Sequence, residues 1–224
     1  MPIEIVIATF LFTCLVCFFS FNLYNILAVH KRRGDAKAYA EVERPSSFAV
    51  NLAAVGTIVY FLEALLYLFL VFTDSIPVLY TFPFSIQFLF TFYMQIAGLV
   101  LTFAGYFLFT WSVAARGTYA VSWEMPEKQK LVTWGPYRYV RHPSYLGYFL
   151  MFFSLFFLWP NLLMLFPIAA VPGYYCVTIE EERLLTQRFG DEYLKYQKKT
   201  GRFIPRLRWH CIHGHAKVSD INVL

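Results

Sequence analysis

The chain has 224 residues, of which 58% are hydrophobic and 21% aromatic, and its formal net charge at pH 7 is +5. This composition is too apolar for a water-soluble domain of this length, and the positive mean hydropathy of +0.52 indicates an integral membrane protein. The basic residues form short clusters between apolar runs, which favours membrane lipids as partners and argues against nucleic acid.

The apolar runs predict an all-α protein with about five transmembrane helices. The runs 3–29, 48–73 and 82–115 each reach the length of about 20 residues that a spanning helix needs. Two shorter runs, 145–159 and 162–178, are separated only by Pro160-Asn161 and predict a tight helical hairpin. Pro167 and Pro172 should kink the last span. We therefore expect a three-helix membrane region at 1–115, a cofactor-binding loop with the hairpin and a C-terminal helix at 116–208, and a flexible tail at 209–224.

The charged residues predict how these helices are oriented. With five spans, all 19 lysines and arginines fall in segments on the same side of the membrane. The positive-inside rule then places the N-terminus outside and the C-terminus in the cytoplasm. We expect the membrane to be the plasma membrane or the endoplasmic reticulum. The polar segments that follow the third and fifth spans should therefore lie near each other.

The first polar segment, 135–147, has the sequence GPYRYVRHPSYLG and precedes the fourth span directly. His142 is predicted as the N-cap of that helix and Pro143 as its first residue. The free amides of the first turn, together with Arg141 and the helix dipole, could hold an anionic group. These amides belong to Ser144, Tyr145 and Leu146. The alternative is a basic anchor at the membrane edge, with tyrosines at the interface.

The second polar segment, 178–196, predicts an amphipathic cytoplasmic helix. Apolar and tyrosine side chains recur on one face at helical spacing, at Leu185, Phe189, Tyr193 and Tyr196. The three consecutive glutamates at 180–182 could simply be solvated. Alternatively, the carboxylates of Glu181 and Glu182 could bind a cation.

Together, the two segments could bind a zwitterion that carries a flat ring. Arg141 and the helix amides would hold its anionic end, and the two carboxylates its cationic end. Aromatic residues near the first segment could stack on a ring or attract a sulfonium group. These are Trp134, Tyr137, Tyr139 and Tyr145. An amino acid attached to a nucleoside is one ligand with these properties.

Glu63 lies inside the second apolar run, where an ionisable side chain is expensive and indicates a functional site. It is a candidate catalytic base. The alternative is a protonated acid that hydrogen-bonds a neighbouring helix.

The segment at 135–147 and the sequence EEERLLTQRFGDEYLKY at 180–196 resemble the isoprenylcysteine carboxyl methyltransferase family. The resemblance covers residues 116–206, and TGRFIP at 200–205 is similar to the prokaryotic branch. It implies a methyltransferase that uses S-adenosyl-L-methionine, with its site inside the membrane domain and closed over by the C-terminal segment. Direct transfer of a methyl group from a sulfonium requires no metal. The implied cofactor residues are Leu131, Val132, Tyr137, His142, Pro143, Ser144, Tyr145 and Glu181. We add Glu182 to them on physical grounds and take Arg141, His142 and Glu63 as the catalytic candidates.

One departure from the family concerns the methyl acceptor. The arginine that the family assigns to substrate, four residues before the cofactor glutamate, is Val177 here, and a family glutamine aligns with Ser122. A prenylcysteine carboxylate therefore lacks its expected partner, and we predict a lipophilic carboxylate or thiol as acceptor. The alternatives are a phospholipid N-methyltransferase, an NADPH enzyme similar to sterol reductases, and a non-catalytic scaffold. The residues of the tail at 210–215 include metal-ligand types, but we predict no metal site there.

Overall fold

The structure, a computed structural model, describes residues 3–33, 46–117 and 130–206, and these residues form helices and connecting turns. Four helical stretches are long and apolar enough to cross a membrane, and a shorter apolar helix accompanies them. The long stretches are α1 (Ile3–Arg33), α2 (Ser47–Phe72), α4 (Thr91–Arg116), and η3 (Leu162–Ala169) continued by α6 (Ala170–Phe189); the shorter helix is α5 (Pro143–Leu158). The chain is therefore a multi-pass, all-α membrane protein, as the sequence predicts.

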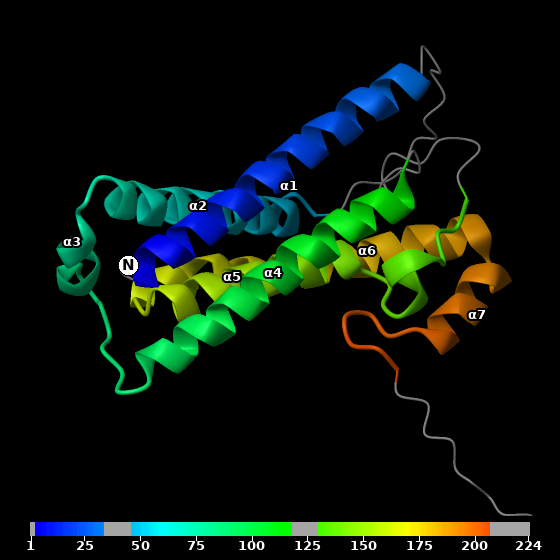
Figure 1. Cartoon of the computed structure of the whole chain (residues 1–224). Coiled ribbons are helices and arrows are strands. Elements are labelled where there is room, and N and C mark those ends of the chain that lie inside the picture. Colours follow the sequence, from blue (N-terminus) through cyan, green and yellow to red (C-terminus); the bar gives the residue numbers. More distant parts are fainter. Residues whose placement is uncertain (1–2, 34–45, 118–129, 207–224) are drawn as a thin grey trace, which may run out of the picture.

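Helix α5 packs closely along α4, because glycines on both helices let the backbones approach (Figure 1). A Cβ atom on Gly105 would lie 2.9 Å from the carbonyl oxygen of Gly147, and one on Gly147 would lie 2.9 Å from that of Gly105. Helices α2 and α6 approach in the same way at Gly173, where a Cβ atom would lie 2.7 Å from the carbonyl oxygen of Ala49. These contacts fix the rotation of α5 and α6 against the rest of the bundle.

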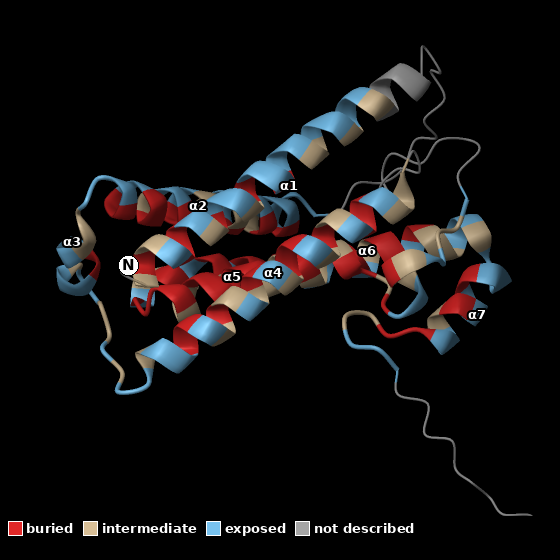
Figure 2. Cartoon of the chain, viewed as in Figure 1, coloured by how far each residue is buried: buried red, intermediate tan, exposed pale blue. Residues whose placement is uncertain are grey.

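The buried residues face the centre of the bundle, while the outer faces of the long helices remain exposed and apolar (Figure 2). This is the arrangement expected when lipid, and not water, surrounds the helices. Within the core, aromatic rings from α2, α4 and α5 meet, and the hydroxyls of Tyr60 and Tyr106 hydrogen-bond at 3.0 Å.

Different helices and turns meet at the two ends of the bundle (Figure 1). One end holds the start of α1, the short helix α3 (Ile76–Thr81), the start of α4 and the turn after α5. The Ile86 amide donates there to the carbonyl oxygen of Pro160 at 2.9 Å. The other end holds the last turns of α4 and α6, the start of α5, η2 (Gly135–Arg138) and α7 (Asp191–Lys199). The two polar segments predicted from the sequence both lie at this second end.

Two element boundaries differ from the sequence predictions. The apolar run 82–115 becomes helical only at Thr91, because Pro83 and the positive φ of 64° at Phe84 turn the chain before it. The second polar segment is interrupted at Gly190, whose φ of 51° ends α6 and lets α7 start in a new direction. Pro167 lies in the 3-10 segment η3, whereas Pro172 falls in the first turn of α6, where no backbone donor is lost.

Candidate functional site

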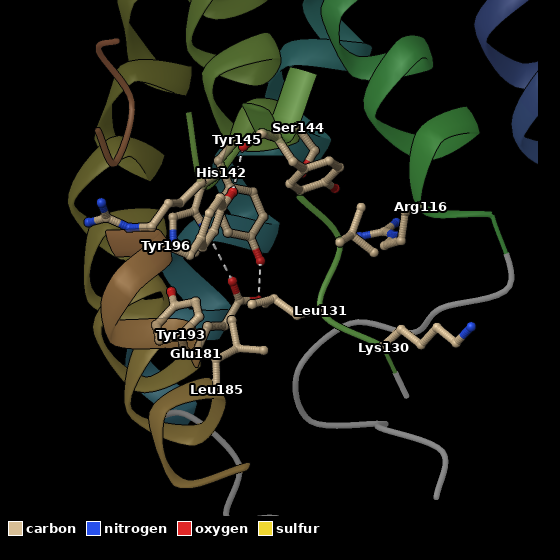
Figure 3. A pocket seen from close by; sticks show the side chains of 13 residues that line it. Arg116, Lys130, Leu131, His142, Ser144, Tyr145, Glu181, Leu185, Tyr193 and Tyr196 are labelled. Atoms are coloured by element: carbon tan, nitrogen blue, oxygen red, sulfur yellow. Dashed lines mark hydrogen bonds and ion pairs between the residues drawn. The ribbon is translucent and has the colours of Figure 1, made fainter. Parts of the chain in front are cut away.

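An open cleft with about 620 Å³ of atom-free space, part of it open to solvent, lies at the polar end of the bundle (Figure 3). It is enclosed by the end of α4, residues 130–137, the start of α5, the last turns of α6, and α7. Its lining includes these residues predicted from the sequence: Leu131, Val132, Tyr137, Arg141, His142, Ser144, Tyr145 and Glu181. The two segments that the family motifs occupy therefore share one cleft.

His142 occupies the corner where the chain enters α5. It is the N-cap of that helix and Pro143 is the first helical residue, which confirms the predicted start. The ring is buried, with Nδ1 3.2 Å from Oε2 of Glu181 and Nε2 3.0 Å from Oε1 of Glu182. Burial alone would lower the pKa of His142, but hydrogen bonds to the two carboxylates outweigh it and raise the pKa above the ordinary value of 6.5. The corner thus favours a protonated imidazolium.

Glu181 is held from the α5 side by two contacts. The Tyr145 hydroxyl donates to Oε1 of Glu181 at 2.7 Å, while His142 contacts the other carboxylate oxygen. The rings of His142 and Tyr145 are nearly parallel, with centroids 5.8 Å apart. Figure 3 shows these side chains converging on the cleft from two helices. The carboxylate is therefore oriented before any ligand arrives.

Glu182 does not line the cleft, although the sequence analysis grouped it with Glu181. Its carboxylate accepts hydrogen bonds from Arg141, His142, Gln197 and Arg202, at donor–acceptor distances of 2.9 to 3.3 Å. Arg141 was expected to hold an anion, but its guanidinium forms an ion pair with Glu182 and donates to the Thr200 carbonyl oxygen. It lines the cleft while its charge is already balanced.

The chain after α7 is tied to the segment before α5. The Arg141 amide donates to the Gly201 carbonyl oxygen at 2.9 Å, and the His142 amide to that of Arg202 at 3.1 Å. Val140 and Gly201 form an isolated parallel bridge. We call residues 200–206 the C-terminal strap. The strap and the hydrogen bonds to the Glu182 carboxylate therefore hold the His142 corner in place.

The first turn of α5 offers fewer free amides than predicted. The Leu146 amide donates to the His142 carbonyl oxygen at 3.1 Å, because the N-cap carbonyl accepts the first intrahelical bond. Among the described residues, the amides of Ser144 and Tyr145 have no such partner and lie at the N-terminus of a 16-residue helix. They remain able to bind an anion.

The sequence analysis did not assign five of the lining residues to the site: Arg116, Lys130, Leu185, Tyr193 and Tyr196. Figure 3 shows Arg116 and Lys130 across the cleft from Tyr193 and Tyr196. Tyr193 is fully buried, and its hydroxyl has no hydrogen-bond partner in the part of the chain that the structure describes. Its place on the predicted buried face of the C-terminal helix was the available signal.

Several predicted residues lie outside the cleft. Glu63 is buried in the middle of α2 and lines no part of it. Trp134 and Tyr139 are half-exposed, and the Trp134 indole donates to the Ala115 carbonyl oxygen. Val177 is buried in α6. Pro143 shapes the start of α5 without lining the cleft, while Ser122 and the tail 210–215 lie outside the described residues.

The side chains of the cleft suit a zwitterion with an aromatic ring. Glu181 offers a carboxylate, and the amides of Ser144 and Tyr145 with Arg116 offer partners for an anionic group. The orphaned Tyr193 hydroxyl is a further buried donor that a ligand could satisfy. S-adenosyl-L-methionine carries an amino-acid group, a sulfonium and an adenine ring, so this set of residues fits it.

The comparisons with known proteins fall on the same part of the chain. A family model described as "Phospholipid methyltransferase" matches residues 93–192. A Protein-S-isoprenylcysteine O-methyltransferase of Schizosaccharomyces pombe is 33% identical over 130 residues, which cover 55% of this chain and 55% of that protein. Its namesake in Xenopus laevis is 30% identical over 121 residues, covering 52% of this chain and 42% of that protein.

The chain spans about half the length of the curated relatives it matches. Two relatives with the same name and one family model agree with the two sequence motifs. These matches support the resemblance seen in the sequence: over about half of its length, the chain is similar to Protein-S-isoprenylcysteine O-methyltransferases.

Proposed function

We propose that this protein is an integral membrane methyltransferase that uses S-adenosyl-L-methionine to methylate a lipophilic acceptor. The observation that carries the proposal is the contact across the cleft, where His142 and Tyr145 of one motif both bind Glu181 of the other. The names of the relatives support a methyltransferase activity. An anchor at the membrane edge would not need this buried, convergent arrangement.

The proposed cofactor contacts follow from charge and hydrogen-bonding capacity. Glu181 would accept from the α-ammonium group, while the amides of Ser144 and Tyr145 would donate to the carboxylate. The apolar side chains of Leu131, Val132 and Leu185 would cover the adenine ring. Tyrosine rings that line the cleft, Tyr137 among them, would face the sulfonium charge.

When bound, S-adenosyl-L-methionine supplies a methyl carbon that a nucleophile attacks, and the electron pair of the broken carbon–sulfur bond goes to sulfur. The chain contributes alignment, and positioning of reacting atoms can account for about 7 to 11 kcal/mol of a barrier. A carboxylate or thiolate acceptor would need no general base. For an ammonium acceptor, the Glu181 carboxylate in the cleft would be the candidate proton acceptor, because His142 is held in its protonated form.

The acceptor would reach the cleft from the membrane, and the charged cofactor from the cytoplasm. Below the cleft the Tyr145 ring contacts Tyr174, which packs against Tyr148 and Phe149 in an aromatic layer. This layer suits a lipophilic chain. The relatives are named for an isoprenylcysteine acceptor, but Val177 is an apolar, buried residue at the position where the family has an arginine.

The family model described as "Phospholipid methyltransferase" supports a second acceptor, a phospholipid amine. Purified protein should therefore be assayed with radiolabelled S-adenosyl-L-methionine and three acceptors: a prenylcysteine analogue, a long-chain thiol and phosphatidylethanolamine. Methylation of phosphatidylethanolamine alone would show that the acceptor is an amine and not a carboxylate or thiol. The proposed cofactor site would be unaffected by that result.

The cofactor site is tested by titrating purified protein with S-adenosylhomocysteine. We expect Glu181→Gln to weaken binding by about 10- to 100-fold, because it removes a charged hydrogen-bond partner. Glu180→Gln is the matched control, since Glu180 pairs with Arg183 on the exposed face. Equal affinities in both variants and the wild type would refute the site. Binding of NADPH in place of S-adenosylhomocysteine would indicate the reductase alternative, and binding of neither would indicate a scaffold.

A further inference from the structure

A second pocket lies at the opposite end of the bundle from the cofactor cleft and plays no part in the proposed methyl transfer. It has about 430 Å³ of atom-free space, part of it open to solvent. It is enclosed by the start of α1, the second half of α2, α3, the start of α4 and the end of α5. Five separate elements therefore contribute to it.

Two polar side chains of this pocket are buried, and one of them lacks a hydrogen-bond partner. Tyr67 is 1% exposed, and its hydroxyl makes no hydrogen bond with any described residue. Gln95 is 6% exposed and lines the same pocket, so its side-chain amide is a second buried polar group there. Leaving a buried hydroxyl unsatisfied costs free energy, so a ligand that hydrogen-bonded to Tyr67 would bind favourably.

The charge of the pocket selects the ligand. Glu4 is the ionisable carboxylate of the lining, and it accepts a hydrogen bond from the Tyr80 hydroxyl. Among the described residues, no lysine, arginine or histidine lines the pocket. A carboxylate without a neighbouring cation repels anions and attracts ammonium groups.

The aromatic lining also favours an ammonium group. Tyr67, Tyr80 and Trp159 all line the pocket, and the faces of tyrosine and tryptophan rings attract cations. The Trp159 indole donates to the Leu79 carbonyl oxygen at 2.9 Å, which fixes the ring in place. Leu79 and Leu158 add apolar surface that would contact a short alkyl chain.

We propose that this pocket binds an alkylammonium group, such as the amine end of a membrane amphiphile. Glu4 balances the charge, the aromatic rings surround the cation, and the oxygen atoms of the Tyr67 hydroxyl and the Gln95 side-chain amide accept hydrogen bonds from the ammonium group. The pocket would act as a second binding site, remote from the cleft at Glu181. This proposal does not depend on the methyltransferase function.

The test is isothermal titration calorimetry of the full chain in an uncharged detergent, with three probes that share a six-carbon chain. The probes are hexylammonium, hexanol and hexanoate. We expect hexylammonium to bind most tightly and hexanoate not to bind. Equal binding of all three would show simple apolar partitioning, and no binding of hexylammonium would show a pocket without this function; either result overturns the proposal.

Matched variants locate the binding. Glu4→Gln should weaken hexylammonium binding by about tenfold or more, whereas Asp74→Asn, an exposed charge at the same end, should not. Tyr67→Phe should weaken it several-fold without lowering the melting temperature, because the hydroxyl has no partner to lose; Tyr93→Phe, on an exposed ring, should change neither. Glu181→Gln should leave the affinity unaltered. If Glu181→Gln abolished binding, or if neither Glu4→Gln nor Tyr67→Phe weakened it, the probe would be binding elsewhere and the proposal would be wrong.

Discussion

Glu181 and Glu182 are adjacent in the sequence but have different surroundings. Successive residues of an α-helix project about 100° apart, so the two carboxylates cannot face the same space. Glu181 faces the cleft, while Glu182 is surrounded by Arg141, His142 and Arg202. We therefore assign Glu182 a supporting role: it holds the strap and the His142 corner in place.

This assignment predicts the effect of Glu182→Gln. The change leaves Arg141, which is nearly buried, without its ion-pair partner, and breaking a buried pair costs about 3 kcal/mol or more. We expect a lower melting temperature and faster proteolysis within residues 200–206. Glu192→Gln, on the exposed face of α7, serves as control. An unchanged melting temperature in Glu182→Gln would contradict the supporting role.

His142 predicts how stability depends on pH. Its pKa is raised in the folded protein above the unfolded value of about 6.5, so protonation stabilises the fold. This contribution is complete below pH 6.5 and is lost as the pH rises through the raised pKa. We expect the melting temperature of the wild type to fall more steeply above pH 6.5 than that of His142→Gln. Parallel curves for the two proteins would exclude a role for this group.

At the scale of elements, glycines decide how closely the helices pack. Gly105 of α4 and Gly147 of α5 meet backbone to backbone, which sets the position of the α5 N-terminus and hence of His142. Glycine is disfavoured within a helix interior in water, but in a membrane it permits close contact between helices. The same feature at Gly173 positions α6 and its glutamates against α2.

Gly105→Ala should therefore destabilise the bundle. The added methyl group would lie 2.9 Å from the Gly147 carbonyl oxygen, so α5 must shift, at a cost of about 1 to 3 kcal/mol. Weaker S-adenosylhomocysteine binding should accompany the lower melting temperature, because the shift moves the His142 corner. Ala114→Ser adds one heavy atom to an exposed position of the same helix and should have little effect. Identical melting temperatures for the two variants would contradict close α4–α5 packing.

At the scale of the whole molecule, each end of the bundle holds a different pocket. The cleft at Glu181, the strap and α7 lie at one end, and the pocket at Glu4 lies at the other (Figure 1). The positive-inside rule would put the cleft on the cytoplasmic side, where the proposed cofactor would reach it.

Cysteine labelling tests this orientation. In a background without the native cysteines, an impermeant maleimide added to the cytoplasmic side of oriented vesicles should label Glu192→Cys and not Asp74→Cys. Both positions are exposed and lie at opposite ends of the bundle. Detergent permeabilisation should make both positions reactive and is the control. Labelling of Asp74→Cys alone would mean that the orientation is inverted.

The sequence by itself determined the membrane character, the approximate spans, the start of α5 at Pro143 and the convergence of the two polar segments. These features depend on hydropathy, proline geometry and charge, which are local or additive properties of the chain. The late start of α4 at Thr91 was missed, because apolar composition does not reveal the turn at Pro83 and Phe84.

Only the tertiary structure decided which side chains face the cleft. It assigned Arg141 to Glu182, brought Arg116 and Tyr193 to the lining, and left Glu63 remote in α2. The rotation of each helix about its own axis selects the residues that face inward, and close packing at glycines such as Gly105 and Gly173 fixes that rotation. A sequence pattern shows the periodicity of a helix, but the contacts with neighbouring helices determine which of its faces points inward.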